Sequence, residues 1–209
     1  MKKILVFISL PASSFTYAQT VQSSEEFLGY KVGTRYTPHW KIVNYFQHVS
    51  ASAPAMVKLE KYGETNEGRP LLLTFIALPQ NLSKLDDIRK NNLRLSGTLN
   101  DKPADENTPA IVWLSYNVHG NEPSSSEAAM FALYAMVNTA ETKTKEWLKN
   151  MVVVIDSCIN PYGRDRYVNW YNSVVGKKMN VNPLSREHAE PWPQGRTNHY
   201  NFDLNRDWA

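Results

Sequence analysis

Cysteine is nearly absent from this chain of 209 residues, which contains only Cys158. A single thiol excludes an intrachain disulfide and a cysteine-rich zinc ribbon. A large excess of charge of one sign is also lacking, because the chain has 23 lysine and arginine residues and 20 aspartate and glutamate residues. A nearly balanced chain offers no basic footprint for a phosphate backbone, so we expect no nucleic-acid partner. No apolar run approaches the roughly 18 residues of a membrane helix, so we expect no stable membrane span.

Composition otherwise places the chain among globular proteins, with 42% hydrophobic and 21% charged residues. Such a composition excludes a disordered tail, a fibre or a coiled coil. The length suits one domain or part of a larger one.

The first 18 residues have the layout of an export signal. Positive residues at Lys2 and Lys3 precede an apolar stretch at 4–10, and small residues then lead to Ala18. This order predicts a secretory signal peptide cleaved after Ala18, with Thr16 a fair residue at the third position before the cut. A buried N-terminal strand is the alternative. The signal implies an exported protein, either periplasmic or secreted.

Apolar periodicity predicts a helix followed by a hairpin. Thr37 and Pro38 suit an N-cap and a first helical residue. Strands are predicted at 56–59 and 71–78, joined by turn residues at 67–70. The helix is marked by apolar residues at helical spacing, namely Trp40, Val43, Phe46 and Val49.

The central part of the chain reads as strand, helix, helix, strand. A continuous apolar run at 110–116 predicts a strand covered on both faces, and 151–156 predicts another. Helices are predicted between them at 123–139 and 142–150. We therefore expect an α/β fold with a mixed, mostly parallel sheet and helices on both faces. The expected inner face of the first helix consists of Ala128, Phe131, Ala132 and Ala135.

Two long stretches lack periodicity. Residues 91–109 are polar and predict a surface loop. Residues 161–202 are rich in Asn, Pro, Gly, Trp and Tyr. An irregular stretch of that length is uncommon unless it is functional.

A histidine and a glutamate follow the strand predicted at 110–116. His119 and Glu122 are three residues apart in a tight turn, so both side chains can reach one point. Catalytic groups in open α/β sheets collect at the carboxyl ends of strands. An imidazole and a carboxylate suit zinc, whose two-His, one-Glu pattern needs another histidine. The alternative is a helix-capping turn with its glutamate on the helix dipole, and this pair alone does not decide between the two.

Two arginines follow the strand predicted at 151–156. Arg164 and Arg166 come directly after an Asn-Pro-x-Gly turn, which can direct them toward the same crevice as His119. An ordinary turn with solvated arginines is the alternative.

Asn205 and Arg206 form a third polar segment. An amide and a guanidinium suit bidentate recognition of a carboxylate. Asp203 and Asp207 flank the pair and can hold the arginine, while Arg196 is a further cation nearby. A surface salt-bridge cluster is the alternative.

In their order along the chain, four motifs resemble the zinc metallocarboxypeptidases of the carboxypeptidase A type. The resemblance runs from about residue 35 to the last residue. It implies that residues 35–209 are the N-terminal part of a zinc carboxypeptidase-like catalytic domain, after a lead-in at 19–34. The motifs are YGETNEGRP at 62–70, HGNE at 119–122, INPYG at 159–163 and DLNRDW at 203–208.

The resemblance also implies roles for individual residues. His119 and Glu122 correspond to ligands of one zinc ion. Asn205 and Arg206 correspond to the pair that holds the terminal carboxylate of a peptide or protein substrate. Arg196 best fits the arginine that stabilises the oxyanion, with Arg164 and Arg166 as competitors. The implied activity is hydrolysis of C-terminal residues from peptides.

Three departures from the family pattern limit this reading. Tyr162 stands where the family usually has Asp in the NPDG turn. The second zinc-binding histidine and the catalytic glutamate lie later in the family's sequence. We therefore expect a fragment that binds zinc weakly and does not hydrolyse peptides alone. The remaining histidines do not match the missing ligand, and they are His39, His48, His188 and His199.

Two other functions stay open. Amidases and deacylases of the aspartoacylase and succinylglutamate desuccinylase group share an HGNE-type turn and a DLNR-type segment. The export signal and the Asn-Pro-x-Gly-Arg turn favour the peptidase. A non-catalytic exported peptide-binding protein on a peptidase scaffold is the other reading, and the missing ligand favours it.

Overall fold

The computed structural model describes residues 21–138, 140 and 142–206. The predicted signal peptide at 1–18 lies outside the described residues, as does Asp207. Among the described residues, no helix is both long and apolar enough to cross a membrane. The elements in chain order are α1 (Ser24–Leu28), α2 (His39–Ser52), β1 (Val57–Glu64), β2 (Pro70–Ile76), α3 (Pro79–Leu82), α4 (Leu85–Leu95), β3 (Ala110–Ser115), α5 (Ser124–Val137), α6 (Thr142–Lys149), β4 (Met151–Asp156), α7 (Pro161–Val174), η1 (Arg186–His188) and η2 (Leu204–Arg206).

The described strands form one mixed sheet in the order β1-β2-β4-β3. The β1–β2 hairpin is confirmed as an antiparallel pair, and β2 pairs with β4 in the same sense. Only β3 and β4 run parallel, joined through α5 and α6 as the βαβ pattern predicted. The mixed α/β fold is therefore confirmed. The expectation of a mostly parallel sheet is wrong for these strands, because the hairpin adds two antiparallel pairings to one crossover.

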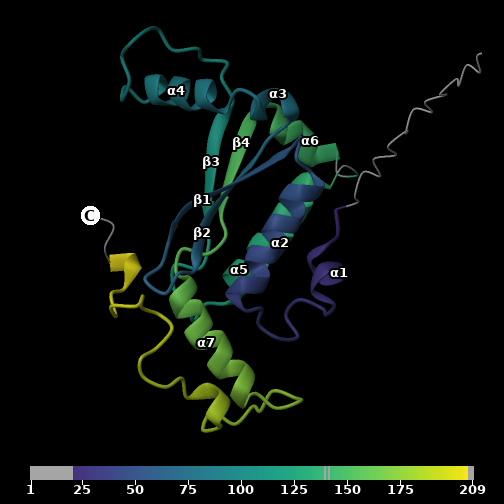
Figure 1. Cartoon of the computed structure of the whole chain (residues 1–209), viewed down its shortest axis with the longest axis vertical. Coiled ribbons are helices and arrows are strands. Elements are labelled where there is room, and N and C mark those ends of the chain that lie inside the picture. Colours follow the sequence, from purple (N-terminus) through teal and green to yellow (C-terminus); the bar gives the residue numbers. More distant parts are fainter. Residues whose placement is uncertain (1–20, 139, 141, 207–209) are drawn as a thin grey trace, which may run out of the picture.

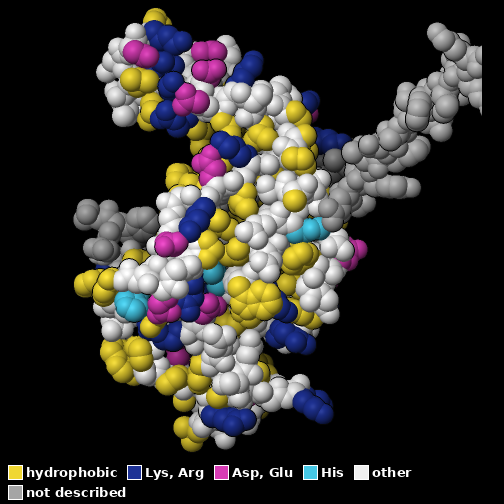
Figure 2. All heavy atoms as spheres, in the orientation of Figure 1, with side chains coloured by type: hydrophobic (Ala, Val, Ile, Leu, Met, Phe, Trp, Pro, Cys, Tyr) yellow, Lys and Arg dark blue, Asp and Glu magenta, His cyan; other side chains and the backbone are white. Residues whose placement is uncertain are grey.

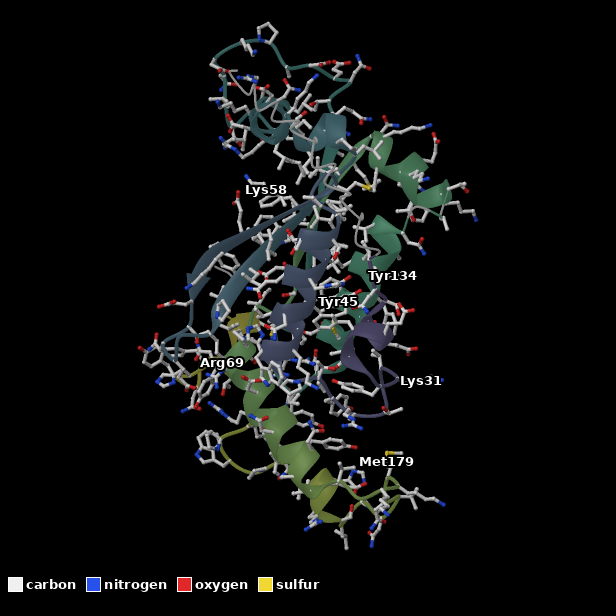
Figure 3. The ribbon with its side chains drawn as sticks, turned by 45° about the vertical axis from the view of Figure 1, so that its right-hand side comes forward. Lys31, Tyr45, Lys58, Arg69, Tyr134 and Met179 are labelled. Carbon is white, nitrogen blue, oxygen red and sulfur yellow. The ribbon has the colours of Figure 1, made fainter. Side chains whose placement is uncertain are left out.

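The main core lies between one face of the sheet and helices α2 and α5 (Figure 1). Alternate residues of β4 divide between the two faces, as a strand requires. Val153 and Ile155 pack toward the two helices, whereas Val152 and Val154 pack with Ile88 of α4 on the opposite face. Helices on both faces are thus confirmed, with α4 at one end of the molecule (Figure 1). Figure 3 shows Tyr45 of α2 and Tyr134 of α5 on the same side of the sheet.

The strand β3 differs from its prediction. It was expected to be covered on both faces, yet Trp113 is 58% exposed and Ile111 is 36% exposed. Its only partner among the described strands is β4, so β3 is an edge of the described sheet. The apolar run reflects strand propensity and one packed face rather than double coverage.

Helix positions were predicted better than helix faces. The expected inner face of α5 is wrong, because Phe131 is 46% exposed and Ala128 and Ala135 are also exposed. Apolar residues occur all around α5, so spacing alone did not select the buried stripe. Ala132 is partly buried against the core. The fully or nearly buried apolar residues are Ala129, Met130, Leu133 and Val137.

Helix α2 also begins differently from its prediction. Pro38 is the N-cap in an extended conformation, and Thr37 lies before it. Trp40 is 58% exposed, whereas Val43, Phe46 and Val49 are buried as expected. The buried side of this helix is therefore confirmed except at its first turn.

Two helices occupy stretches that were expected to be irregular. Helix α4 takes up the first part of 91–109, and α7 takes up the first part of 161–202. The side chain of Asn160 caps α7 by accepting a hydrogen bond from the Gly163 amide at 2.9 Å. Proline at the first position and a side-chain cap are both helix-start signals, which the Gly- and Asn-rich composition obscured. The stretch after α7 is mostly irregular, as predicted.

Charged side chains of both signs are mixed on the face of the molecule drawn in Figure 2. On α4, Asp86 forms ion pairs with Arg89 and Lys90. This view agrees with the balanced composition, since lysine and arginine side chains do not form a separate tract on that face.

The observed face of α5 predicts a contrast between two neighbouring substitutions. We expect Leu133→Ala to lower the free energy of unfolding by about 2–5 kcal/mol, because it empties a fully buried site. Phe131→Ala, on the exposed side, is expected to cost less than about 1 kcal/mol. Urea denaturation followed by circular dichroism measures both. A larger loss for Phe131→Ala would contradict the observed helix face.

Candidate active site

The turn that follows β3 brings His119 and Glu122 together. Nδ1 of His119 lies 2.9 Å from Oε1 of Glu122. The turn is closed by a hydrogen bond from the Glu122 amide to the His119 carbonyl, at 3.1 Å. His119 is only 7% exposed, whereas the Glu122 side chain is 62% exposed. The imidazole of the pair is therefore largely buried, whereas the carboxylate faces solvent.

A distant segment of the chain supplies the other side of this site. Oδ1 of Asp203 lies 3.1 Å from Nε2 of His119. Nε of Arg196 donates to Oδ2 of the same carboxylate at 2.9 Å, and its Nη1 lies 3.4 Å from Nδ1 of His119. His119 and Asp203 are separated by 84 residues in sequence. The structure thus brings His119, Glu122 and Arg196 into one cluster.

Asp203 faces Nε2 of His119 as a carboxylate. Burial acts to raise the pKa of Asp203, but hydrogen bonds from the Asn205 amide and from Arg196 hold it below its ordinary value. A carboxylate accepts only, so either His119 ring nitrogen donates to its carboxylate when it carries the proton. With the proton on Nε2, His119 donates to Asp203, and the lone pair of Nδ1 faces Glu122 and Nη1 of Arg196. Two electron-pair donors that converge on one point suit a cation, and the Asp203 contact is the type that orients a metal-binding histidine.

This pair of donors fits zinc only as part of a ligand set. A catalytic zinc site in proteins has three protein ligands and an open position. Within residues 21–138, 140 and 142–206, no group of three or more His, Cys, Asp or Glu side chains is arranged to hold a metal. His119 and Glu122 therefore fit two of the positions, and the described part of the chain identifies no third.

The two competing arginines have other partners. Arg164 is fully buried, and its guanidinium makes five hydrogen bonds within the protein. Arg166 donates to the Gln194 and Asn198 carbonyls and lies over the Tyr162 ring, 4.2 Å from its centroid. Of the three arginines, only Arg196 contacts His119.

Asn205 and Arg206 lie next to Asp203 on η2. The backbone amide of Asn205 donates to Oδ1 of Asp203 at 3.0 Å, which is the same oxygen that contacts Nε2 of His119. Both residues are exposed. Asp203 was expected to hold Arg206, but its carboxylate binds Arg196 and His119 instead. The Arg206 guanidinium donates to the Asn205 carbonyl at 3.2 Å.

Three glycines let the motif segments approach closely. A Cβ atom on Gly120 would lie 2.0 Å from the Gly163 carbonyl carbon and 2.1 Å from the Arg164 amide nitrogen. A Cβ atom on Gly163 would lie 2.2 Å from the Gly195 carbonyl oxygen. None of these three distances is possible for a Cβ atom, so the three backbones touch directly. Only glycine permits this contact between the turn of His119, the start of α7 and the segment of Arg196.

Tyr162, at the position where aspartate is usual, serves as an aromatic platform. Its ring lies edge-on to His199, with centroids 5.1 Å apart, and Arg69 lies over it at 5.5 Å. Arg69, at the end of the β1–β2 connection and labelled in Figure 3, also pairs with Asp165 of α7 at 2.8 Å. With Tyr162 at this position, the Asn160 side chain caps α7.

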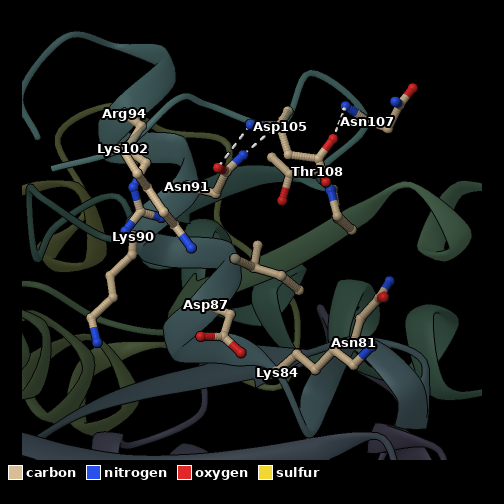
Figure 4. Close-up of a pocket in the computed structure, with 12 residues that line it drawn as sticks. Asn81, Lys84, Asp87, Lys90, Asn91, Arg94, Lys102, Asp105, Asn107 and Thr108 are labelled. Carbon is tan, nitrogen blue, oxygen red and sulfur yellow. Dashed lines mark hydrogen bonds between the residues drawn. The ribbon is translucent and has the colours of Figure 1, made fainter. Parts of the chain in front are cut away.

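The polar cavity drawn in Figure 4 is not part of this site. It has a volume of about 470 Å³, and its twelve lining residues all fall between positions 81 and 109. Asn81, Lys84 and Arg94 lie on its walls (Figure 4). No residue of the 119–122 turn lines it.

Sequence reasoning missed two parts of the site. Asp203 was not expected to contact His119, and Asn117 was not singled out at all. Asn117 is 2% exposed and adopts a positive φ of 58°. A polar residue directly between a buried strand and a candidate ligand was the available signal. Cys158 is buried, and burial raises the pKa of its thiol to about 12.

Comparison with known proteins agrees with these motifs. A sequence profile of the zinc carboxypeptidase family matches residues 42–209. The chain therefore belongs to the zinc carboxypeptidase family. Members of this family are zinc-dependent hydrolases that act on peptides.

Solved structures with some likeness to the chain are carboxypeptidases or related proteins. A metallo-carboxypeptidase from Burkholderia cenocepacia is 16% identical, with 83% of this chain and 33% of that chain covered and a TM-score of 0.47. Carboxypeptidase A from Helicoverpa armigera is 15% identical, with 68% and 31% covered and a TM-score of 0.47. Bovine thrombin-activatable fibrinolysis inhibitor, in complex with a tick carboxypeptidase inhibitor, is 17% identical, with 63% and 33% covered and a TM-score of 0.44. The chain thus spans about a third of the length of these structures.

The contact of the three glycines predicts that Gly120→Ala is strongly destabilising. The new methyl group meets backbone atoms that cannot rotate away, so we expect a loss of about 3 kcal/mol or more. Thermal and urea unfolding measure this loss. Gly63→Ala is the matched control, because its Cβ would lie 3.7 Å from a Leu71 side-chain carbon, an ordinary contact. Equal losses in the two variants would contradict a special contact at Gly120.

Proposed function

We propose that this chain carries part of the active site of a zinc-dependent metallocarboxypeptidase, which removes C-terminal residues from peptides. The single observation that carries the proposal is the convergence of His119, Glu122, Arg196 and Asp203 from two distant segments. Family membership supports the reaction class. The substrate is a peptide or protein with a free C-terminus.

His119 and Glu122 are proposed to hold one zinc ion through Nδ1 and the carboxylate. A zinc ion held there would supply Lewis-acid polarisation of a scissile carbonyl and would lower the pKa of a coordinated water. Asp203 is proposed to hold the His119 imidazole in the orientation that presents Nδ1. The third ligand and the general base are not assigned to any described residue.

Arg196 is proposed to stabilise the oxyanion that develops on the substrate carbonyl. Its Nη1 lies 3.4 Å from His119 Nδ1, and its Nε donates to Asp203 at 2.9 Å. A fixed cation beside the reacting carbonyl stabilises developing negative charge. Its side chain is 36% exposed, so it is accessible to a substrate.

Asn205 and Arg206 are proposed to bind the terminal carboxylate of the substrate. Both lie on exposed η2, next to the Asp203 that contacts His119. An arginine fork matches a carboxylate in a bidentate way. Recognition of a free carboxylate beside the metal position would restrict cleavage to the last peptide bond.

Zinc affinity tests the proposal. In a competition titration with a chromophoric chelator, we expect the chain to bind zinc weakly. His119→Ala and Glu122→Ala are expected to lower its affinity at least about tenfold, because each removes a donor atom. His188→Ala is the control, since this exposed histidine contacts the Asn180 carbonyl instead. Equal affinity in all four proteins would contradict the assignment of the ligands.

Activity assays on the same preparations separate the alternative functions. With two assigned ligands, the chain alone is expected to hydrolyse neither N-blocked dipeptides nor N-acyl amino acids. Hydrolysis of the dipeptides would contradict the expected inactivity and support the peptidase. Hydrolysis of N-acyl amino acids alone would favour the deacylase group, and zinc-independent peptide binding would favour a binding protein.

We also propose that the protein is exported and is periplasmic or secreted. The supporting feature is the order of Lys2, Lys3, the apolar stretch at 4–10 and the small residues before Ala18. Expression in a bacterium, followed by fractionation and N-terminal sequencing, is expected to give a product that begins at Gln19. Retention in the cytoplasm with Met1 in place would contradict the proposal.

A further inference from the structure

Asn117 contacts both residues that are proposed as zinc ligands. It lies between β3 and the turn, and its Nδ2 donates to the His119 carbonyl at 2.6 Å and to the Glu122 carbonyl at 3.3 Å. An amide group has two N–H donors, so these two contacts use both of them. One side chain thus fixes the backbone of the turn at both ligand positions.

The other end of the Asn117 amide faces the Arg164 guanidinium. Its Oδ1 accepts from Nη1 of Arg164 at 2.9 Å. Oγ of Ser126 lies 2.9 Å from this oxygen and 2.7 Å from the Ser157 carbonyl, and the two acceptors share its one proton. The Cys158 thiol lies 3.6 Å from the same oxygen. Donors therefore surround the oxygen and carbonyls surround the nitrogen, so only one orientation of the amide satisfies all partners.

Arg164 connects this amide to the rest of the protein. Its Nη1 also donates to the Pro123 carbonyl at 2.6 Å, just after the turn. Its remaining donors bind the Thr37 carbonyl and Glu127, whose carboxylate accepts from Thr37 as well. The buried guanidinium is therefore paired and fully hydrogen-bonded, which makes it a rigid support. Arg164 holds the turn from both sides, at Asn117 and at Pro123.

We propose that Asn117 is a positioning residue for the metal site, held in place by Arg164. The inference rests on the proposed zinc function of His119 and Glu122. Asn117 does not bind the metal, because both ends of its amide are engaged by the protein. It acts by fixing the backbone from which the two ligands project. Partners that orient ligands in this way typically change metal affinity by about 10- to 100-fold when they are lost.

Asn117→Asp is the sharpest test of this role. It keeps the size of the side chain and the oxygen that faces Arg164, but it replaces two N–H donors by an acceptor. That acceptor faces the His119 and Glu122 carbonyls, so the turn is expected to open. We expect zinc affinity to fall about 10- to 100-fold in the chelator competition. We also expect the visible absorption of bound cobalt(II) to change in intensity, because the ligand geometry changes.

Asn81→Asp is the matched control. Asn81 is 9% exposed, and its Nδ2 also bridges two carbonyls, those of Leu148 and Lys149, at 3.2 Å each. Loss of this amide is expected to lower stability to a similar extent as Asn117→Asp. It is expected to change zinc affinity less than about twofold and to leave the cobalt spectrum unchanged, because Asn81 is remote from the turn. A difference in metal binding at equal stability loss separates positioning from general destabilisation.

The outcomes distinguish the inference from the function on which it rests. If the unchanged chain binds zinc and Asn117→Asp binds it equally well, the positioning role is wrong and the proposed function stands. If His119→Ala does not weaken zinc binding, the proposed function falls and the inference falls with it. Should Asn117→Asp fail to fold, Asn117→Gly replaces it, since glycine readily adopts the positive φ at this position. Affinity in that variant equal to the unchanged chain would overturn the inference.

Discussion

The buried guanidinium of Arg164 is the interaction on which the candidate site depends. A charge removed from water is tolerated only when it is paired and its donors are satisfied. Arg164 meets both conditions by binding groups from the segment before α2, the turn after β3 and the first turn of α5. Those elements cannot move apart without leaving an unsatisfied buried charge. One side chain therefore ties the segment before α2 and the first turn of α5 to the turn that carries His119.

Direct backbone contact adds a second constraint. Gly120, Gly163 and Gly195 place three segments closer together than any side chain would allow. Arg166 then holds the segment after η1 to α7 through two carbonyls. The same segment continues to Arg196 and Asp203, so fixing it at Gly195 also fixes the carboxylate beside His119. The absence of a side chain at these three glycines thus explains why their segments can meet.

The sequence predicted the convergence of the motifs but not how they are held. Order and spacing were sufficient for the βαβ unit, the hairpin and the pairing of His119 with Glu122. Spacing was not sufficient to rank Arg164 against Arg196, because burial of an arginine depends on partners that are distant in sequence. The predicted buried face of α5 was wrong for a related reason, since a helix that is apolar on all sides has no preferred stripe. Helix α7 was missed because its capping signals lie within a Gly- and Asn-rich stretch.

The two halves of the candidate site differ in a way that suits their proposed tasks. His119 is buried, and its backbone is held by a network with a single consistent arrangement of donors and acceptors. Metal ligands need such rigidity, because coordination distances tolerate little error. Asn205 and Arg206 instead lie exposed on a single helical turn, where side chains can adapt to different terminal residues. Asp203 joins the two halves, because its Oδ1 contacts the His119 imidazole and accepts a hydrogen bond from the backbone amide of Asn205. Oδ1 of Asp203 would thus fix the position of a substrate carboxylate bound at η2 relative to the metal ligand His119.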